Sequence, residues 1–177
     1  YQGESNNSRA EQYRVLLPML IKEWRQEFHN PGLYFCVVQL PAYKGPKIES
    51  WPEIREAQLL TARSIPYTAL VVTIDAGERD NLHSLNKRPV GERLAVLAAN
   101  NVYGILQPHK GPELESIKCE NDCMILTFDP GGGGLTTWKR KPLCGFYIAE
   151  KEGDFAEAHA EIDGNRIRVW SEVVAHP

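Results

Sequence analysis

An aspartate and a histidine stand three residues apart in Asp80-Asn81-Leu82-His83, shortly after an apolar run rich in β-branched side chains. That run, residues 70–74, predicts a buried strand, and α/β enzymes carry their chemistry on the loops that leave such strands. An aspartate that orients a histidine, which then accepts a proton from a nucleophile, supplies two of the three members of a hydrolytic triad. The alternative is a polar surface turn without chemistry.

The first eight residues are dense in hydrogen-bonding side chains and directly precede a helical pattern. Ser8 followed by Glu11 matches a capping box, so helix capping alone can explain their composition. An amide at the end of a strand can also donate a hydrogen bond to a developing oxyanion. Gln2 is the better candidate for that role.

Composition excludes two large classes of partner. The 177 residues carry 20 Lys and Arg against 23 Asp and Glu, for a net charge of −3 and no long basic run. Electrostatic binding of nucleic acid is therefore not expected. No apolar run approaches the roughly 20 residues that span a bilayer, so we expect no membrane partner. The chain begins with Tyr1 and still looks strand-like at residues 173–177, so we expect a piece of a longer protein.

Residues 1–107 show helical and strand patterns in alternation. Apolar side chains recur every three or four residues over the first helix, and the two strand-like runs are continuously apolar. The predicted elements are a helix at 9–28, a strand at 33–40, a helix at 51–63, a strand at 69–74 and a helix at 87–100. This order predicts right-handed parallel βαβ connections in part of a doubly wound sheet. Its open edge leads us to expect an N-terminal portion that completes it.

Residues 108–177 have a different texture, with short runs, frequent turns and no helical pattern. Asp163-Gly164-Asn165 between two strand-like runs predicts a hairpin. Short strands at this spacing predict a small antiparallel β-sandwich.

Cys36, Cys119, Cys123 and Cys144 match neither a dense disulfide framework nor a zinc site with paired cysteines. Cys119 and Cys123 flank a turn-like triplet, so a disulfide and two reduced thiols are both compatible with the sequence.

Several longer segments occur in a set order along the chain. They are Tyr-Gln-Gly-Glu-Ser-Asn at 1–6, Val-Gln-Leu-Pro-Ala-Tyr at 38–43, Trp-Pro-Glu-Ile-Arg-Glu-Ala-Gln at 51–58 and Asp-Asn-Leu-His-Ser-Leu-Asn-Lys-Arg-Pro-Val-Gly-Glu-Arg-Leu-Ala at 80–95. Together they resemble the C-terminal half of the sialate O-acetylesterase family of SGNH-type carbohydrate esterases. The resemblance continues into the family's β-rich tail through Leu-Thr-Phe-Asp at 126–129, the glycine loop at 131–134 and Ala-Glu-Ile-Asp-Gly-Asn at 160–165.

The resemblance implies a flavodoxin-like sheet and a secreted, periplasmic or extracellular enzyme. That enzyme would hydrolyse acetyl esters on sugar hydroxyls through an acyl-serine, with no metal or cofactor. His83 would be the general base, and Asp80 its orienting carboxylate. The remaining roles fall on the N-terminal segment, where Gln2 and Gly3 would form the oxyanion hole and Glu4 and Asn6 would support it.

The chain departs from the family at the nucleophile. The family's serine lies in a Gly-Gln-Ser-Asn block, which does not occur in residues 1–177. Ser5 and Ser8 stand in a different block, and Ser84 directly follows His83 and is poorly placed to be activated by it. We therefore expect a missing N-terminal part of the same protein to carry the serine, and this chain alone to be inactive. Two alternatives stay open: a non-catalytic glycan-binding or scaffold module, and an esterase of another acyl substrate.

Overall fold

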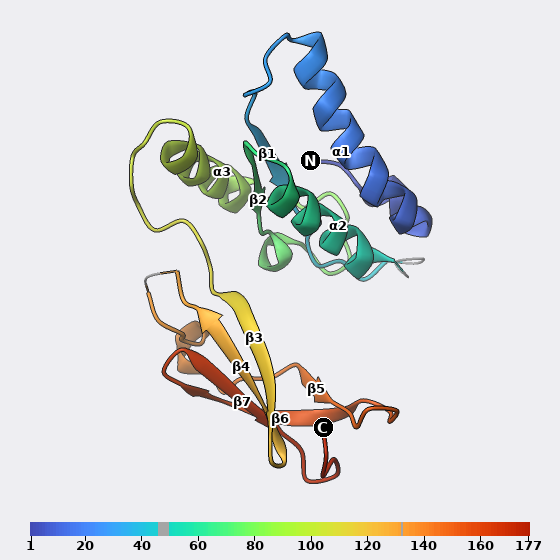
Figure 1. The fold of residues 1–177 in the computed structure, drawn as a ribbon, viewed down its shortest axis with the longest axis vertical. Helices are drawn as coiled ribbons and strands as arrows, with labels where there is room; N and C mark the ends of the chain where they lie inside the picture. Colours follow the sequence, from blue (N-terminus) through green and yellow to red (C-terminus); the bar gives the residue numbers. More distant parts are fainter. Residues whose placement is uncertain (46–49, 132) are drawn as a thin grey trace. The chain divides into compact units, whose positions relative to one another are not determined.

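The computed structural model describes residues 1–45, 50–131 and 133–177. The chain divides into two compact units, Tyr1–Gln107 and Pro108–Pro177 (Figure 1). Across the described residues, no helix is both long and apolar enough to cross a membrane. The glycine loop at 131–134 contains residue 132, which lies outside the described residues.

The first unit is a parallel βαβ arrangement with further helices. Its elements are the 3₁₀ helix η1 (Glu4–Arg9), α1 (Ala10–Glu27), β1 (Phe35–Val38), α2 (Trp51–Ser64), β2 (Thr68–Val71), the 3₁₀ helix η2 (Ile74–Ala76) and α3 (Arg88–Asn101). β1 and β2 pair in parallel, from Phe35 opposite Thr68 to Val38 opposite Val71. In Figure 1, α1 and α2 lie on one side of this strand pair and α3 on the other. The predicted α/β class is confirmed.

The second strand is shorter than predicted because the chain turns soon after Val71. The Thr73 hydroxyl is buried and donates a hydrogen bond to the backbone carbonyl of Gln39, beyond the end of β1. η2 then begins at Ile74. β-branched residues continue through this turn, so the composition of the segment does not reveal where the strand ends.

The core of the first unit lies between α1, α2 and the face of the sheet that they cover. Tyr13, Leu17 and Ile21 form the buried stripe of α1, and they pack in one cluster with Leu40 and Ile54. Burying each of these large apolar side chains contributes about 1.5–3 kcal/mol relative to leaving it exposed.

A second apolar stripe of α1 is exposed. We call it the outer face of α1, and it consists of Val15, Leu16, Met19, Leu20 and Trp24 of the helix and of Phe28, which directly follows it. The sequence pattern predicts Leu16, Leu20, Trp24 and Phe28 in one stripe with the buried residues, whereas in the structure these four side chains are exposed. α1 therefore carries apolar side chains that the described part of the unit does not cover.

The second unit is a single antiparallel sheet, not the predicted two-sheet sandwich. Its strands are β3 (Glu113–Glu120), β4 (Cys123–Asp129), β5 (Phe146–Ile148), β6 (Ala156–Asp163) and β7 (Arg166–Trp170), in the order β3-β4-β7-β6-β5, with the 3₁₀ helix η3 (Trp138–Arg140) before β5. The sheet curls (Figure 1) and collects its apolar side chains around Ile148, Ile167, Val169 and Val174. A strongly twisted sheet can thus enclose its own apolar face without a second sheet.

The predicted hairpin is confirmed between β6 and β7. Asp163 pairs with Arg166, which leaves a two-residue loop whose first position, Gly164, has φ of 61°. A positive φ at that position favours glycine.

The thiols of Cys119 and Cys123 are free. Along the hairpin of β3 and β4, Cys119 lies opposite Met124 and Cys123 opposite Glu120. The two cysteines are therefore offset by one position, which explains why the turn between them does not join them.

Candidate active site

Asp80 and His83 lie on the loop that connects β2 to α3, and both side chains are exposed. Within the described ranges, no hydrogen bond or ion pair joins the two side chains. The structure therefore places them on one loop without bringing them into the contact that a triad requires.

Glu78 and Asn81 organise the backbone around His83. The Glu78 carboxylate accepts a hydrogen bond from the Leu85 backbone N–H at 2.8 Å and another from the Asn81 side-chain amide at 3.0 Å. Asn81 in turn accepts one from the His83 backbone N–H at 3.0 Å. The bonds from Leu85 and Asn81 lower the pKa of Glu78, so its charged form is favoured. The backbone N–H groups of His83 and Leu85 are thus bound by two residues that the sequence did not single out.

Arg93 of α3 fixes the start of the same loop. Its guanidinium donates to both carboxylate oxygens of Asp75 at 2.6 and 2.7 Å, and to the Val72 backbone carbonyl at 2.8 Å. The hydrogen bond from Arg93 is the main cause of a lowered pKa at Asp75. Such a forked contact fixes direction as well as distance.

We expect Asp75→Asn to reduce the loss of folding stability that occurs as the pH falls below about 4. The pKa of Asp75 is lower in the folded protein than in the unfolded chain, so the unfolded chain binds the proton more readily. The contribution of the charged Asp75 carboxylate to the free energy of unfolding is present above the ordinary aspartate pKa of about 3.9. It is lost as the pH falls through the lower pKa of the folded protein. Both side chains are partly exposed, so solvent limits the effect to at most about 1 kcal/mol.

The measurement is the free energy of unfolding in urea at pH 7 and pH 3. The substituted protein should lose less stability between the two pH values than the parent. Asp154→Asn removes an exposed aspartate of the second unit and should leave the difference unchanged. An unchanged difference in Asp75→Asn would show that the forked contact contributes nothing.

The N-terminal segment is internally bonded. The Gln2 side-chain amide donates to Asn6 Oδ1 at 2.8 Å, and the Asn6 backbone N–H donates to the Gly3 carbonyl at 2.9 Å. Asn6 is buried and Gln2 is exposed. Burial and a hydrogen bond to the Glu4 carboxylate raise the pKa of Tyr1. Asn6 therefore directs the Gln2 amide, and Glu4 contacts the neighbouring tyrosine.

Gln58 is the buried link between this segment and the sheet. Its side-chain oxygen accepts from the Leu40 backbone N–H at 3.0 Å, just beyond β1. Its amide nitrogen donates to the Gln2 carbonyl at 2.9 Å and contacts the Tyr13 hydroxyl at 3.3 Å. Gln58 is fully buried, so none of these bonds can be replaced by water at the surface.

Gly3 packs closely against Gln58 and Ile54. Its φ is 144°, and a Cβ there would lie 3.1 Å from Ile54 Cγ2 and 3.2 Å from Gln58 Nε2. A side chain at this position would meet both an unfavourable backbone conformation and a close neighbour. The Trp-Pro-Glu-Ile-Arg-Glu-Ala-Gln segment contains Gln58, but its spacing did not reveal that the residue faces inward.

We expect Gln58→Met to lower the free energy of unfolding by about 1–3 kcal/mol, because it preserves volume but leaves the buried Leu40 N–H without a partner. The Gln2 carbonyl loses one of its two donors and keeps the Tyr13 hydroxyl. Urea unfolding measures the change. Gln12→Met on the exposed side of α1 is the matched control and should change stability by less than about 0.5 kcal/mol. Equal stability of the two substituted proteins would contradict the role given to Gln58.

The segments that follow β1 and β2 run side by side beyond the ends of the strands. The Ala42 N–H donates to the Ile74 carbonyl at 3.1 Å, and the Lys44 N–H donates to the Arg79 carbonyl at 2.7 Å. The carboxyl ends of both strands therefore feed one edge, the edge where open α/β sheets bind ligands. Among the described residues, no hydrogen bond joins Gln2 or Gly3 to Asp80 or His83.

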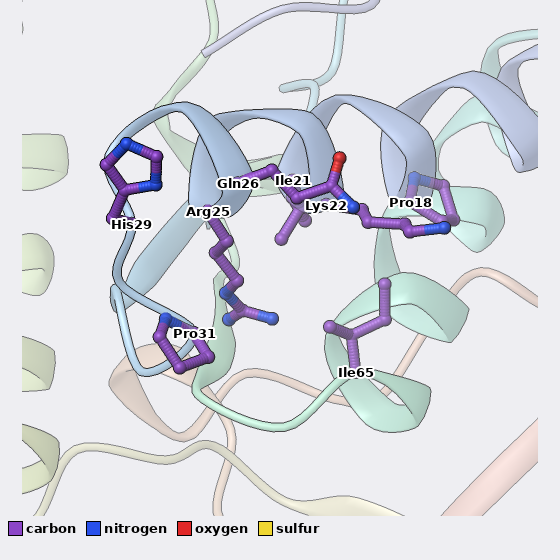
Figure 2. A pocket seen from close by; sticks show the side chains of 8 residues that line it. All are labelled: Pro18, Ile21, Lys22, Arg25, Gln26, His29, Pro31 and Ile65. Carbon is purple, nitrogen blue, oxygen red and sulfur yellow. The ribbon is translucent and has the colours of Figure 1, made fainter.

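A pocket of about 760 Å³ lies elsewhere in the first unit (Figure 2). Pro31 and Ile65 on its wall precede β1 and β2, so it belongs to the amino ends of the strands, and none of the predicted site residues lines it. The Arg25 guanidinium in its wall donates to the backbone carbonyls of Leu33, Pro66 and Tyr67. Over the described ranges, no group of three or more His, Cys, Asp or Glu side chains could hold a metal ion.

Comparison with known proteins gives one consistent match. A family described as carbohydrate esterase, sialic acid-specific acetylesterase matches residues 1–100. The sialate O-acetylesterases of Mus musculus and Rattus norvegicus are 32% and 31% identical over 151 residues, which cover 73% of this chain and 28% of each relative. The crystal structure of a carbohydrate acetylesterase from Xanthomonas citri matches with a TM-score of 0.93 at 34% identity. The match covers 100% of this chain and 42% of the Xanthomonas citri chain. The chain thus spans less than a third of the length of the two rodent relatives.

Proposed function

The chain belongs to the sialic acid-specific acetylesterase family of carbohydrate esterases, and on that premise we propose that it forms part of an enzyme that hydrolyses acetyl esters on sugar hydroxyls. The observation that supports this most strongly is the family match over residues 1–100, because that range contains every residue assigned a catalytic role below.

In the proposed reaction, His83 accepts the proton of a serine hydroxyl as the serine oxygen attacks the acetyl carbon. The tetrahedral intermediate collapses, the sugar oxygen leaves with the proton from His83, and an acetyl-serine remains. Water then attacks the acetyl group and gives its proton to His83. Acetate departs as the proton returns to the serine. Asp80 orients the imidazole and stabilises its charged form.

The carbonyl oxygen becomes negatively charged in both tetrahedral intermediates. The Gln2 side-chain amide and the Gly3 backbone N–H are the proposed donors to that oxygen. Asn6 supports the arrangement because it already fixes the direction of the Gln2 amide. Gln58 supports it because it ties the Gln2 carbonyl to the end of β1.

The missing contact between Asp80 and His83 is compatible with this mechanism. Catalytic hydrogen bonds are often long or misaligned before the site is complete and shorten in the reacting complex. We propose that the nucleophilic serine comes from a part of the enzyme outside this chain, because these 177 residues contain no Gly-Gln-Ser-Asn block.

The test compares the 177-residue chain with a protein of the length of its relatives, using an aryl acetate, acetylated sialic acid, acetylated xylan and short acyl lipids. The longer protein should give an initial burst that serine-directed inhibitors abolish, and it should prefer an acetylated sugar. The chain alone should give none. A burst from the chain alone would overturn the proposal of an external serine. Glycan binding without hydrolysis by the longer protein, unchanged in His83→Ala and Asp80→Ala, would favour a binding module.

A further inference from the structure

The two carboxylate oxygens of Glu78 each accept a hydrogen bond from the loop that carries His83. Oε1 accepts from the Leu85 backbone N–H at 2.8 Å, and Oε2 accepts from the Asn81 side-chain nitrogen at 3.0 Å. Asn81 Oδ1 then accepts from the His83 backbone N–H at 3.0 Å. Glu78 therefore binds the Leu85 N–H directly and the His83 N–H through Asn81.

The direction of every bond in this network depends on Glu78 being an acceptor. An ionised carboxylate has two acceptor oxygens and no donor, whereas a side-chain amide has one donor end and one acceptor end. Because Glu78 accepts from the nitrogen end of the Asn81 amide, the oxygen end faces the His83 N–H. The carboxylate therefore sets the orientation of the Asn81 amide, and that amide fixes the His83 backbone.

Glu78 is charged under the conditions in which His83 can act as a base. The hydrogen bonds from Leu85 and Asn81 are the two largest causes of a pKa below the usual glutamate range. That range already lies well below the ordinary pKa of a histidine. Both Glu78 oxygens are therefore acceptors whenever the imidazole is neutral, and hydrogen bonds to a charged acceptor are stronger than those to a neutral one.

The backbone position of His83 matters for the proposed reaction because a general base must lie within hydrogen-bond reach of the proton that it accepts. The His83 side chain is exposed, and among the described residues no hydrogen bond holds its imidazole. The bond from its backbone N–H to Asn81 is thus the contact that fixes this residue. A displacement of about 1 Å at a reacting group can lower a rate by about 100-fold.

We propose that Glu78 is a positioning residue for His83 and that it acts through its two acceptor oxygens, which bind Leu85 and orient Asn81. The inference rests on the proposed function, in which His83 is the general base. The hydrogen-bond network itself does not depend on that function, so the two can be tested separately.

Glu78→Gln preserves the shape of the side chain but replaces one acceptor with a donor. If the new nitrogen faces Leu85, two donors oppose each other. If it faces Asn81, the Asn81 amide must reverse, and its nitrogen then opposes the His83 N–H. Either arrangement leaves one backbone N–H without its acceptor. In a protein of the length of its relatives, kcat for an acetylated sugar should fall by about 10–100-fold and KM should change little.

A second substitution should restore the network. In the double variant Glu78→Gln/Asn81→Asp, the new amide at position 78 can accept from Leu85 and donate to the new carboxylate at position 81. The other oxygen of that carboxylate can accept from the His83 N–H. We expect kcat to return to within about threefold of the parent. Asn81→Asp alone should lower kcat, because two carboxylates then oppose each other. Glu23→Gln, at an exposed position of α1, is the control and should keep the parent kcat.

Amide hydrogen exchange of the same proteins tests the network without any use of activity. The peptide that contains His83 and Leu85 should exchange about tenfold faster in Glu78→Gln than in the parent, and it should return to the parent rate in the double variant. Exchange at the parent rate in Glu78→Gln would overturn the proposal.

The kinetic results can overturn the proposal in two further ways. One is an unchanged kcat in Glu78→Gln beside a large loss in His83→Ala, and the other is a loss in Glu78→Gln that the double variant does not recover. If Glu78→Gln does not fold, the double variant decides, because a parent-like kcat supports the proposal and a lowered kcat contradicts it. Full activity in His83→Ala would contradict the proposed function instead.

Discussion

Replacing His83 with alanine in a protein of the length of its relatives should lower kcat for an acetylated sugar by about 10³–10⁴-fold and leave KM nearly unchanged. The alanine cannot accept the serine proton or return it to the leaving sugar oxygen. The loop should keep its shape, because Glu78 and Asn81 accept hydrogen bonds from the backbone N–H groups of Leu85 and His83 and do not contact the imidazole. Steady-state kinetics measure the effect, and the free energy of unfolding should change little.

His176→Ala is the matched control, since it removes an exposed histidine of the second unit. It should keep the parent kcat. A loss of less than tenfold in His83→Ala would show that another group is the general base. A parallel loss of stability would show that the imidazole has a structural role instead.

The largest expected effect on stability is that of Gly77→Ala. A Cβ at position 77 would lie 2.2 Å from the Ala42 carbonyl oxygen and 2.9 Å from Pro41 Cβ. The first neighbour is backbone, so it cannot move aside as a flexible side chain would. Relief requires displacing the segment after β1, which pairs with the Ile74 and Arg79 carbonyls. We expect the free energy of unfolding to fall by about 3 kcal/mol.

Gly91→Ala provides the opposite control. Gly91 lies in α3, and a Cβ there would meet nothing within 4 Å. Alanine should stabilise this helix by about 0.5–1 kcal/mol, because glycine is unfavourable in a helix interior. Urea unfolding of both proteins separates the two effects. If Gly77→Ala were as stable as the parent, the segments after β1 and β2 could not be packed as tightly as the structure has them.

The first unit could be read from the sequence because its patterns are local. Apolar spacing revealed the helix at 9–28, and continuous apolar runs revealed both strands. The second unit was harder. Alternating side chains predict that a strand has one buried face, but they do not say whether a second sheet or the curl of the same sheet covers it. The group around Ile167 and Val169 forms by curling, which depends on contacts between strands far apart in the chain.

Some residues of the candidate site could be proposed from the sequence, and others could be found only in the structure. Asp80 and His83 could be proposed from their types and spacing, and Gln2 from its amide. Glu78 and Gln58 could not, because they act through hydrogen bonds to backbone groups elsewhere in the fold. The separate inner and outer stripes of α1 also required the structure, since one helical pattern contains both.

Arg25 has a consequence that extends beyond the pocket it lines. Its guanidinium binds the carbonyl of Leu33 shortly before β1 and those of Pro66 and Tyr67 just before β2. It also lies over the Phe35 ring at 5.6 Å. Parallel strands have no tight turn to fix their alignment, and a slip of one residue would exchange the two faces of a strand. Because one guanidinium binds the chain just before both strands, it fixes the register of β1 against β2. The register in turn determines where each strand ends at the opposite edge of the sheet.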